Sequence, residues 1–405
     1  MLTIENELQK VNFSEDPASY LADLTASATS SANIKYHAAI VMEKSKARKA
    51  IQKFTKLIES AYDPAADVLK ILNDAENFVY QQITGETTTR TASLNEVLQQ
   101  SVEYIESIQG ASGGIIGLAT GLDFDKILSG FQPGKLYVPA GRPGTGKTAL
   151  VLQILKAVGS AGNSAGVISL EMGKRSLGNR MVLAHAGIDN TKALQGQLNQ
   201  DEIKRLVDAA GELSQLNIYI DDTTHLTPAL LRIKARMMKQ VYGIELLAVD
   251  YLQLMASDGK QSREQEVADI SRTCKLLSKE LDIPILALAQ LSREPDKRRG
   301  WATRPQLSDL RESGAIEQDA DVVMFLYRPE EYGLERYENG ATTAGITEVI
   351  IAKHRDGPTG FKKLFFEKNT MTFKNLAPDR PDPKPTPKPI QPHQLPYKDD
   401  DLSPF

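Results

Sequence analysis

A strand, a glycine-rich turn and a helix are expected around residue 141, and this arrangement constrains the fold more than any other feature. The turn, Gly141-Arg142-Pro143-Gly144-Thr145-Gly146-Lys147-Thr148, fits the pattern G-x-x-x-x-G-K-[ST] of a phosphate-binding loop. Apolar residues 136–140 precede it, and residues 149–158 predict a helix after it. Backbone N–H groups of such a loop bind phosphate at a helix N-terminus. We expect Lys147 to reach the β- and γ-phosphates and Thr148 to coordinate Mg²⁺; a glycine-rich turn in an unrelated α/β protein is the alternative.

The composition is that of an ordinary globular protein without a membrane-spanning segment. Of its 405 residues, 41% are hydrophobic and 25% charged, and no apolar run approaches the roughly 18 residues that span a bilayer. The single cysteine, Cys274, excludes an intramolecular disulfide and a cysteine-built zinc site, and its helical surroundings predict a core position. The N-terminus resembles neither a signal nor a transit peptide, so we expect a cytoplasmic protein. The net charge of −4 does not indicate nucleic-acid binding, although a ring around one strand needs few donors per subunit.

Residues 115–376 alternate between strand and helix patterns, which is typical of an α/β fold. The short apolar strand candidates are 136–140, 166–170, 217–220, 246–249, 284–289 and 322–326. They are apolar throughout, as buried parallel strands are. Residues 348–354 and 361–367, separated by a segment with two glycines and a proline, predict a terminal hairpin. We therefore expect a RecA-like P-loop NTPase motor domain here.

Three further parts are expected outside this domain. Residues 1–84 predict a small all-helical N-terminal domain, with one helix over 32–62 and a second that restarts at Asp63-Pro64. Residues 85–114 predict a linker that carries a helix over 93–109, opened by the capping box Ser93–Glu96. The isolated apolar stripe of this helix needs a partner, and a neighbouring subunit is one candidate. Residues 377–405, with proline at alternate positions from 381 to 389, predict a disordered tail.

A basic run lies on the first predicted helix. We interpret it as a solvated face, with a nucleic-acid contact as the less favoured alternative. It comprises Lys44, Lys46, Arg48, Lys49, Lys53 and Lys56.

Three polar residues at strand ends complete the expected nucleotide site. Asp250 follows strand 246–249, which we expect beside the P-loop strand, and it would hold the water shell of Mg²⁺. Glu171 follows strand 166–170 and can act as the general base for the attacking water, with a plain surface charge as the alternative. Gln290 follows strand 284–289, where a neutral amide can sense the γ-phosphate without adding charge.

Five segments, in order and spacing, closely resemble the replicative hexameric DNA helicases of the DnaB family. They are ISLEM at 168–172, VDYLQLM at 249–255, AQLSR at 289–293, SDLRESGAIEQDAD at 308–321 and IAKHRDGPTG at 351–360. The string at 308–321 is far more specific than a P-loop alone. The resemblance covers about 110 to 370 and extends upstream to the helical hairpin and to helix 93–109, which is similar to the family's linker helix that docks on the adjacent subunit.

The resemblance implies a homohexameric ring that uses ATP and Mg²⁺ to move 5′→3′ on single-stranded DNA and to unwind duplex at a replication fork. Glu171 would activate water, and Gln290 would couple the γ-phosphate to a DNA-contacting loop. Arg355, with Lys353, would reach the nucleotide of a neighbouring subunit. The channel loop that holds the backbone of single-stranded DNA would contain Arg311, Glu312 and Gly314. Without the resemblance, these charges would be a surface ion pair and an edge-strand pattern.

The sequence also departs from the family. Asp356 stands where an asparagine is usual, and Gly144-Thr145 replaces Ser-Met. Only 30 residues precede Ser31, so we expect the family's first helices to be abbreviated or missing, which leaves open the N-terminal dimer collar and its contacts with primase or a helicase loader. The acidic tip 399–405 resembles the C-terminal tip of bacterial single-stranded DNA-binding proteins, which would give it replication or repair partners; a solubilising tail is the alternative.

Two other activities of a RecA-fold ATPase stay open at this point. One is a strand-exchange filament, against which the string at 308–321 argues. The other is a DNA clamp or loading platform that does not unwind, against which the Glu171 and Arg355 candidates argue.

Overall fold

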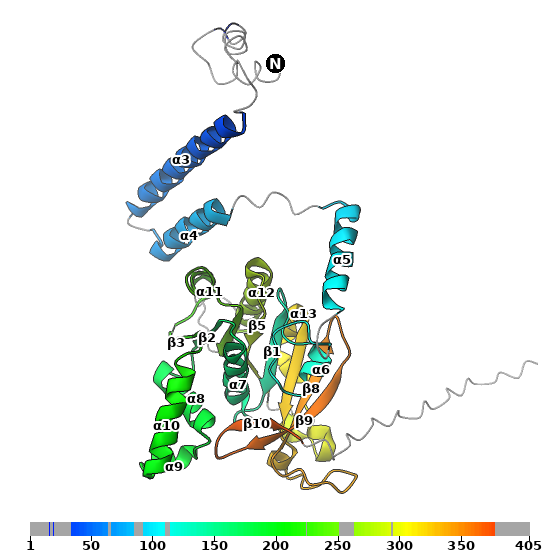
Figure 1. Cartoon of the computed structure of the whole chain (residues 1–405). Helices are drawn as coiled ribbons and strands as arrows, with labels where there is room; N and C mark the ends of the chain where they lie inside the picture. Colours follow the sequence, from blue (N-terminus) through cyan, green and yellow to red (C-terminus); the bar gives the residue numbers. More distant parts are fainter. Residues whose placement is uncertain are drawn as a thin grey trace, which may run out of the picture. The chain divides into compact units, whose positions relative to one another are not determined.

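The computed structural model describes residues 34–63, 66–84, 92–109, 114–223, 225–250, 263–292 and 295–376, together with Asp16 and Ser19. The chain divides into two units, Met1–Val97 and Leu98–Phe405 (Figure 1). The predicted linker residues 85–91, most of the segment VDYLQLM, Arg293, and the tail with its acidic tip lie outside the described residues. None of the described helices is long and apolar enough to cross a membrane.

The described residues of the first unit include the helices α3 (Ile34–Ala61) and α4 (Val68–Thr84), as the periodicity predicts. The rings of Phe54 on α3 and Phe78 on α4 meet edge to face, 5.6 Å apart. The predicted start of the second helix was wrong, because Asp67 and not Asp63 caps α4. The Asp67 carboxylate accepts the N–H of Lys70 at 3.3 Å, and the helix begins one residue after it.

Helix α5 (Leu94–Ile108) carries the predicted capping box and an exposed apolar stripe. The N–H of Ser93 donates to the Glu96 carboxylate at 2.8 Å, and the N–H of Glu96 donates to the Ser93 hydroxyl at 3.3 Å. The side chains of Leu94, Val97, Leu98, Val102 and Ile105 are between 44% and 73% exposed. The stripe is thus well formed but not buried.

One mixed sheet organises the second unit. The order of its described strands is β10-β9-β8-β7-β1-β5-β4-β2-β3, and the short β6 pairs with β1 beyond the end of β5. The strands are β1 (Leu136–Gly141), β2 (Ala165–Ser169), β3 (Ile218–Asp221), β4 (Leu246–Asp250), β5 (Ile285–Ala287), β6 (Ala289–Gln290), β7 (Val322–Tyr327), β8 (Ile346–His354), β9 (Gly360–Glu367) and β10 (Thr372–Asn375). Strands β1 to β7 pair in parallel, whereas β8, β9 and β10 join by antiparallel pairing.

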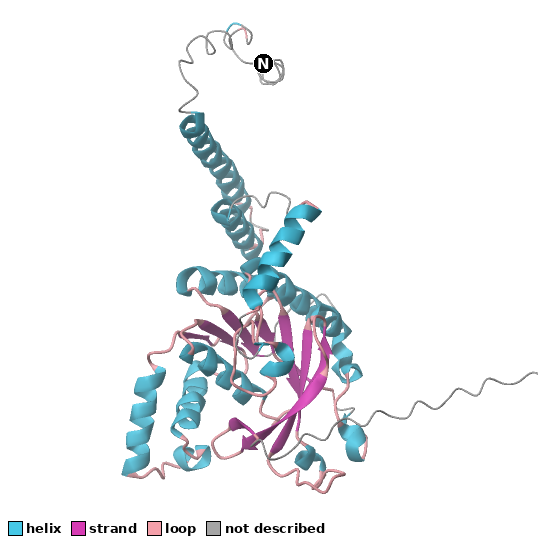
Figure 2. Cartoon of the chain, turned by 45° about the vertical axis from the view of Figure 1, so that its right-hand side comes forward, coloured by secondary structure: helices cyan, strands magenta, loops and turns pink. Residues whose placement is uncertain are grey.

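Helices pack on both faces of this sheet (Figure 2). The helices of the second unit are α6 (Asp125–Leu128), α7 (Lys147–Ser160), α8 (Lys174–Ala186), α9 (Asn190–Leu194), α10 (Gln200–Leu213), α11 (Pro228–Tyr242), α12 (Arg263–Leu281) and α13 (Gly314–Asp319). Short 3₁₀ turns are η4 (Pro295–Lys297), η5 (Gly300–Thr303), η6 (Leu307–Ser313) and η7 (Pro329–Tyr332). Alternate β1 residues serve two cores: Tyr137 packs with α7, and Val138 packs with α11 and α12. This arrangement confirms the predicted α/β class.

The structure differs from the predicted fold in two further details. The single strand expected over 284–289 is two strands, because Leu288 turns its N–H to the carbonyl of Val249 and leaves the pairing with β1. Strand β10 was not predicted. Cys274 is buried as expected, and burial raises the pKa of its thiol to about 12.

Candidate nucleotide and DNA site

The glycine-rich segment forms a tight turn between the end of β1 and the start of α7. Gly144 and Gly146 have backbone φ angles of +83° and +93°, values that residues other than glycine rarely adopt. A Cβ atom at Gly146 would also lie 3.0 Å from the ring of Phe373. Residue 146 therefore needs glycine for both its backbone and its surroundings.

Lys147 is held inside this turn by the turn's own carbonyl groups. Its Nζ donates to the carbonyl of Gly141 at 2.8 Å and to that of Arg142 at 3.2 Å. Burial lowers the pKa of Lys147 to about 8, although the negative charges of Asp250 and Glu171 oppose the shift. A buried ammonium whose partners are neutral carbonyls is well placed to accept an anion.

Thr148 and Asp250 form the second part of the site. The Thr148 hydroxyl donates to the Asp250 carboxylate at 3.1 Å. Burial raises the pKa of Asp250 to about 6; the charge of Glu171 adds to the shift, and the Thr148 hydrogen bond and Lys147 oppose it. The expectation that Asp250 ends a strand beside β1 was wrong, because β5 lies between β1 and β4. The carboxylate reaches the P-loop because Thr148 extends toward it.

A cavity of about 490 Å³ brings most of the predicted nucleotide residues together. Its lining comprises Pro143, Gly144, Gly146, Lys147, Thr148, Ala149, Glu171, Arg180, Gln290, Arg328, Glu331, Phe366, Lys368 and Met371. Glu171 is exposed and lies two residues beyond the end of β2. Gln290 is half-buried in β6, where it pairs with Gly141. The two strand-end residues therefore face the same space as the P-loop.

The sequence prediction missed several residues of this cavity, of which Arg328 is the most informative. Its side chain is only 3% exposed, and its Cζ lies 4.9 Å from the ring centroid of Phe366. It pairs with Glu330 and, at 3.3 Å, with Glu331, while its buried Nε has no hydrogen-bond partner among the described residues. Arg328 follows β7 directly, and β7 is parallel to β1, so a search of strand ends would have found it.

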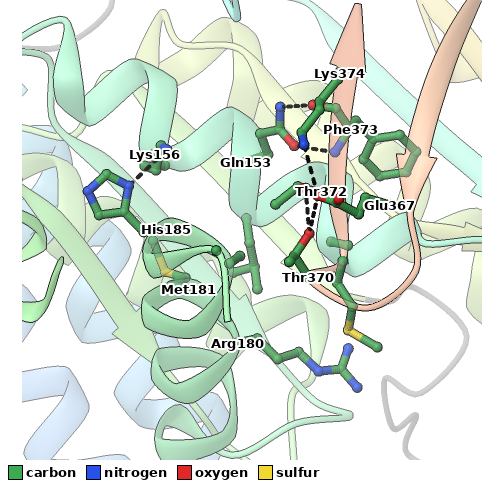
Figure 3. Close-up of a pocket in the computed structure, with 15 residues that line it drawn as sticks. Gln153, Lys156, Arg180, Met181, His185, Glu367, Thr370, Thr372, Phe373 and Lys374 are labelled. Carbon is green, nitrogen blue, oxygen red and sulfur yellow. Dashed lines mark hydrogen bonds and ion pairs between the residues drawn. The ribbon is translucent and has the colours of Figure 1, made fainter. Parts of the chain in front are cut away.

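A second pocket of about 240 Å³ adjoins this cavity, between α7, α8 and the turn from β9 to β10 (Figure 3). The two share Ala149, Arg180 and Met371. The Gln153 amide bonds both the N–H and the carbonyl of Phe373, each at 2.8 Å, and so ties α7 to β10.

Lys353 and Arg355 lie away from the P-loop of their own chain. Lys353 lies at the end of β8 and Arg355 is the first residue after it. This end of β8 pairs with the start of β7, which lies beside Tyr137 of β1. The P-loop begins four residues further along β1, roughly 13 Å away at the rise of a strand. The structure therefore separates this pair from the other nucleotide residues.

Contacts within the chain hold both basic side chains at this edge. Lys353 donates its Nζ to the carbonyl of Glu317, and Arg355 donates to the carbonyl of Gln318. Arg355 also pairs with the Asp321 carboxylate at 3.2 Å. Burial lowers the pKa of Lys353, and the charge of Arg355 adds to the shift.

The predicted DNA residues lie on η6 and at the start of α13. The side chains of Arg311 and Glu312 are outside the described part of the chain. Gly314 is exposed and opens α13, and a Cβ atom there would meet nothing within 4 Å. Its backbone is therefore accessible from outside.

Comparisons with known proteins agree with this geometry. The family described as "DnaB-like helicase C terminal domain" matches residues 117–375. The replicative DNA helicase DnaC of Bacillus subtilis is 38% identical over 382 residues, which cover 93% of this chain and 83% of that protein. The replicative DNA helicase DnaB of Geobacillus stearothermophilus is 37% identical over 362 residues, which cover 88% and 78%.

A solved structure has a similar fold. It is described as that of a DnaB-like replicative helicase and its interactions with primase, and it aligns with a TM-score of 0.69 at 33% identity, covering 89% of this chain and 83% of that one. The resemblance seen in the sequence motifs thus extends to most of the chain and to its three-dimensional structure. The chain belongs to the DnaB family of replicative DNA helicases.

Proposed function

We propose that the chain assembles into a homohexameric ring that uses ATP and Mg²⁺ to move 5′→3′ along one DNA strand and to unwind the duplex at a replication fork. Membership of the family makes it a replicative DNA helicase that hydrolyses nucleotide and binds DNA. The observation that carries the assignment of its site is the cavity shared by Lys147, Thr148, Glu171 and Gln290.

In this proposal the P-loop holds the phosphates of ATP. The N–H groups of the loop and the charge of Lys147 bind the β- and γ-phosphates. Glu171 accepts a proton from the attacking water, and Gln290 contacts the γ-phosphate from β6. The position of both side chains on the rim of the P-loop cavity supports these roles.

Thr148 and Asp250 fit a magnesium ion. Their oxygen atoms are 3.1 Å apart, and Mg²⁺ in nucleotide sites takes one or two protein oxygen ligands together with phosphates and water. The bound ion would neutralise charge on the phosphate oxygens. Asp250 must be ionised for this, and its raised pKa makes the ionisation sensitive to mild acid.

Arg355 and Lys353 act in trans in this proposal. They lie toward the amino ends of the parallel strands, opposite the P-loop, so we assign them to the nucleotide of an adjacent subunit. An arginine supplied in trans can raise the rate of phosphoryl transfer by roughly 10³ to 10⁵. The exposed stripe on α5 supports a contact between subunits, because an apolar helix face of this kind needs a partner.

DNA contact is assigned to Arg311, Glu312 and Gly314, which would hold the strand by its backbone. Such contacts carry little sequence information, so we expect slight base preference. We also propose that the chain contacts primase, a helicase loader and the partners of a single-strand-binding protein. The solved relative that was studied for its interactions with primase supports the first of these.

A forked duplex with a free 5′ tail tests the proposal. The parent chain and a Glu338→Gln control, which changes an exposed loop residue, should unwind it with ATP. Glu171→Gln should bind DNA and ATP without unwinding. Strand binding without unwinding by the parent would favour the clamp or loading platform. Filaments in place of closed rings in electron micrographs would favour strand exchange.

A further inference from the structure

Arg142 of the P-loop makes an ion pair and a hydrogen bond with the segment that follows Gln290. The side chain of Arg142 is 20% exposed, and its guanidinium pairs with the Asp296 carboxylate at 2.8 Å. It also donates to the carbonyl of Leu291 at 3.2 Å. A planar guanidinium that makes two such bonds fixes both the distance and the orientation of its partners.

The next link runs from this segment to η6. Arg298 donates to the Asp309 carboxylate and, at 3.2 Å each, to the carbonyls of Ala302 and Arg304. Asp309 is only 2% exposed, and its second oxygen accepts the N–H of Gln306 at 2.7 Å. Because Asp309 lies in the first turn of η6, Arg298 anchors the start of that element.

The two links share one short turn. Asp296 lies within η4, and the N–H of Arg298 donates back to the carbonyl of Pro295 at 3.2 Å. A displacement of Asp296 is therefore passed to Arg298. The N–H of Ser292 also donates to the carbonyl of Asp309 at 3.1 Å, so the two ends of the segment meet at the same residue.

We propose that the ion pairs Arg142–Asp296 and Arg298–Asp309 transmit the nucleotide state of the P-loop to the segment Leu307–Asp319. Asp296 and Arg298 are positioning residues in this inference, which rests on the proposed function, since that segment carries the residues assigned to DNA. The link begins at the loop itself, because the carbonyl of Arg142 accepts the Nζ of Lys147 at 3.2 Å. When Lys147 turns to a phosphate, the backbone at Arg142 loses that bond.

The surroundings of the ion pair Arg142–Asp296 leave room for η4 to move. The pair Arg142–Asp296 borders a hollow of about 650 Å³, which Arg298 and Thr303 also line. Asp296 is 41% exposed, and ion pairs this accessible contribute little to stability. Removing its charge should therefore leave the fold intact while changing the orientation of η4.

The test compares Asp296→Asn with the parent chain and with Asp208→Asn, an exposed control on α10. The DNA affinity of each full-length protein is measured with ADP and with a non-hydrolysable ATP analogue, on a fluorescent single strand. Coupling between two sites typically amounts to 5- to 150-fold. We expect the ratio of the two affinities to fall from this range to near one in Asp296→Asn, and to stay unchanged in the control.

Reciprocity supplies a readout that a loss of stability would not move. DNA must change the ratio of the affinities for the ATP analogue and for ADP by the same factor, and this factor must shrink equally in Asp296→Asn. Turnover without DNA should stay within about twofold of the parent. Asp296→Glu, which keeps the charge, should retain part of the coupling.

Two negative results have different meanings. A parent that responds to nucleotide, together with an Asp296→Asn variant that responds equally, would overturn the link alone. A parent whose DNA affinity does not depend on nucleotide would overturn the proposed motor function and the link with it.

Discussion

Phosphate binding by this protein should depend on pH in a range where an ordinary lysine does not titrate. Burial lowers the pKa of Lys147 from 10.5 to about 8. The side chain is then about nine-tenths charged at pH 7 and about one-tenth charged at pH 9. If the ammonium binds phosphate, the affinity for ADP should fall about tenfold over this interval, which corresponds to about 1.4 kcal/mol.

The assay is binding of a fluorescent ADP analogue between pH 7 and pH 9, without Mg²⁺ so that metal binding does not contribute. Lys147→Arg is the matched control, because a guanidinium stays charged throughout this range. Its affinity, whatever its absolute value, should not fall in the same way. Calorimetry in two buffers gives a second measure, because binding at pH 8 should take up about half a proton in the parent.

A flat profile in the parent between pH 7 and pH 9 would refute a phosphate-binding ammonium with this pKa. A loss of affinity as steep in Lys147→Arg as in the parent would also refute it, since the titrating group would then lie elsewhere. Binding of ADP without proton uptake at pH 8 would point to the same conclusion.

Three further outcomes follow from the site and its support. Because the pKa of Asp250 is about 6 and its protonated form does not bind metal, Mg²⁺-dependent nucleotide affinity should be about tenfold weaker at pH 5 than at pH 7, with a flat profile in Asp250→Asn. Gly146→Ala should weaken nucleotide binding at least tenfold, by about 1–2 kcal/mol of backbone strain and by contact with a phenylalanine ring; Gly162→Ala, at φ +88° in open space, should lose stability but keep nucleotide. Arg304→Met should lower the free energy of unfolding by about 3–5 kcal/mol, because Glu348 is fully buried, and Glu348→Gln in the same chain should restore most of it in thermal melts.

The parts of the site that depend on local geometry could be predicted from the sequence. The P-loop is one, because its glycines have torsion angles that few other residues adopt and its flanks carry strand and helix patterns. The capping box of α5 is another, because both hydrogen bonds lie within four residues. The α/β class followed from the alternation of patterns.

The remaining parts depend on pairing between distant segments. Nothing in the residues around Asp250 states that β5 separates its strand from β1, because strand order is decided by the whole sheet. Strand β10 has four residues, two of them exposed, and so presents no apolar run to recognise. Its contact with Gly146 through Phe373 was therefore outside the reach of the sequence patterns.

Asp321 gives Arg355 a partner that can be given up at low cost. Its carboxylate also accepts the N–H of Leu136 at 2.7 Å and the Nζ of Lys275 at 2.6 Å, so it stays satisfied when the arginine leaves. Arg355 is 44% exposed, and the carboxylate that binds it has other donors. Its ion pair with Asp321 is therefore easily broken. In the proposed ring, a triphosphate bound to the adjacent subunit would compete with Asp321 for this arginine.

Departure of Arg355 would also remove one of the side-chain donors to the Gln318 carbonyl, near the end of α13, and leave only the longer contact with the Lys353 ammonium at 3.5 Å. If Arg355 acts in trans as proposed, closure of a subunit interface over a bound nucleotide would therefore loosen contacts at the end of α13, the helix that begins at Gly314. A subunit beside an empty nucleotide site would keep the ion pair between Arg355 and Asp321, and its segment Leu307–Asp319 would stay in place. Around a ring, that asymmetry would give the subunits an order in which to act.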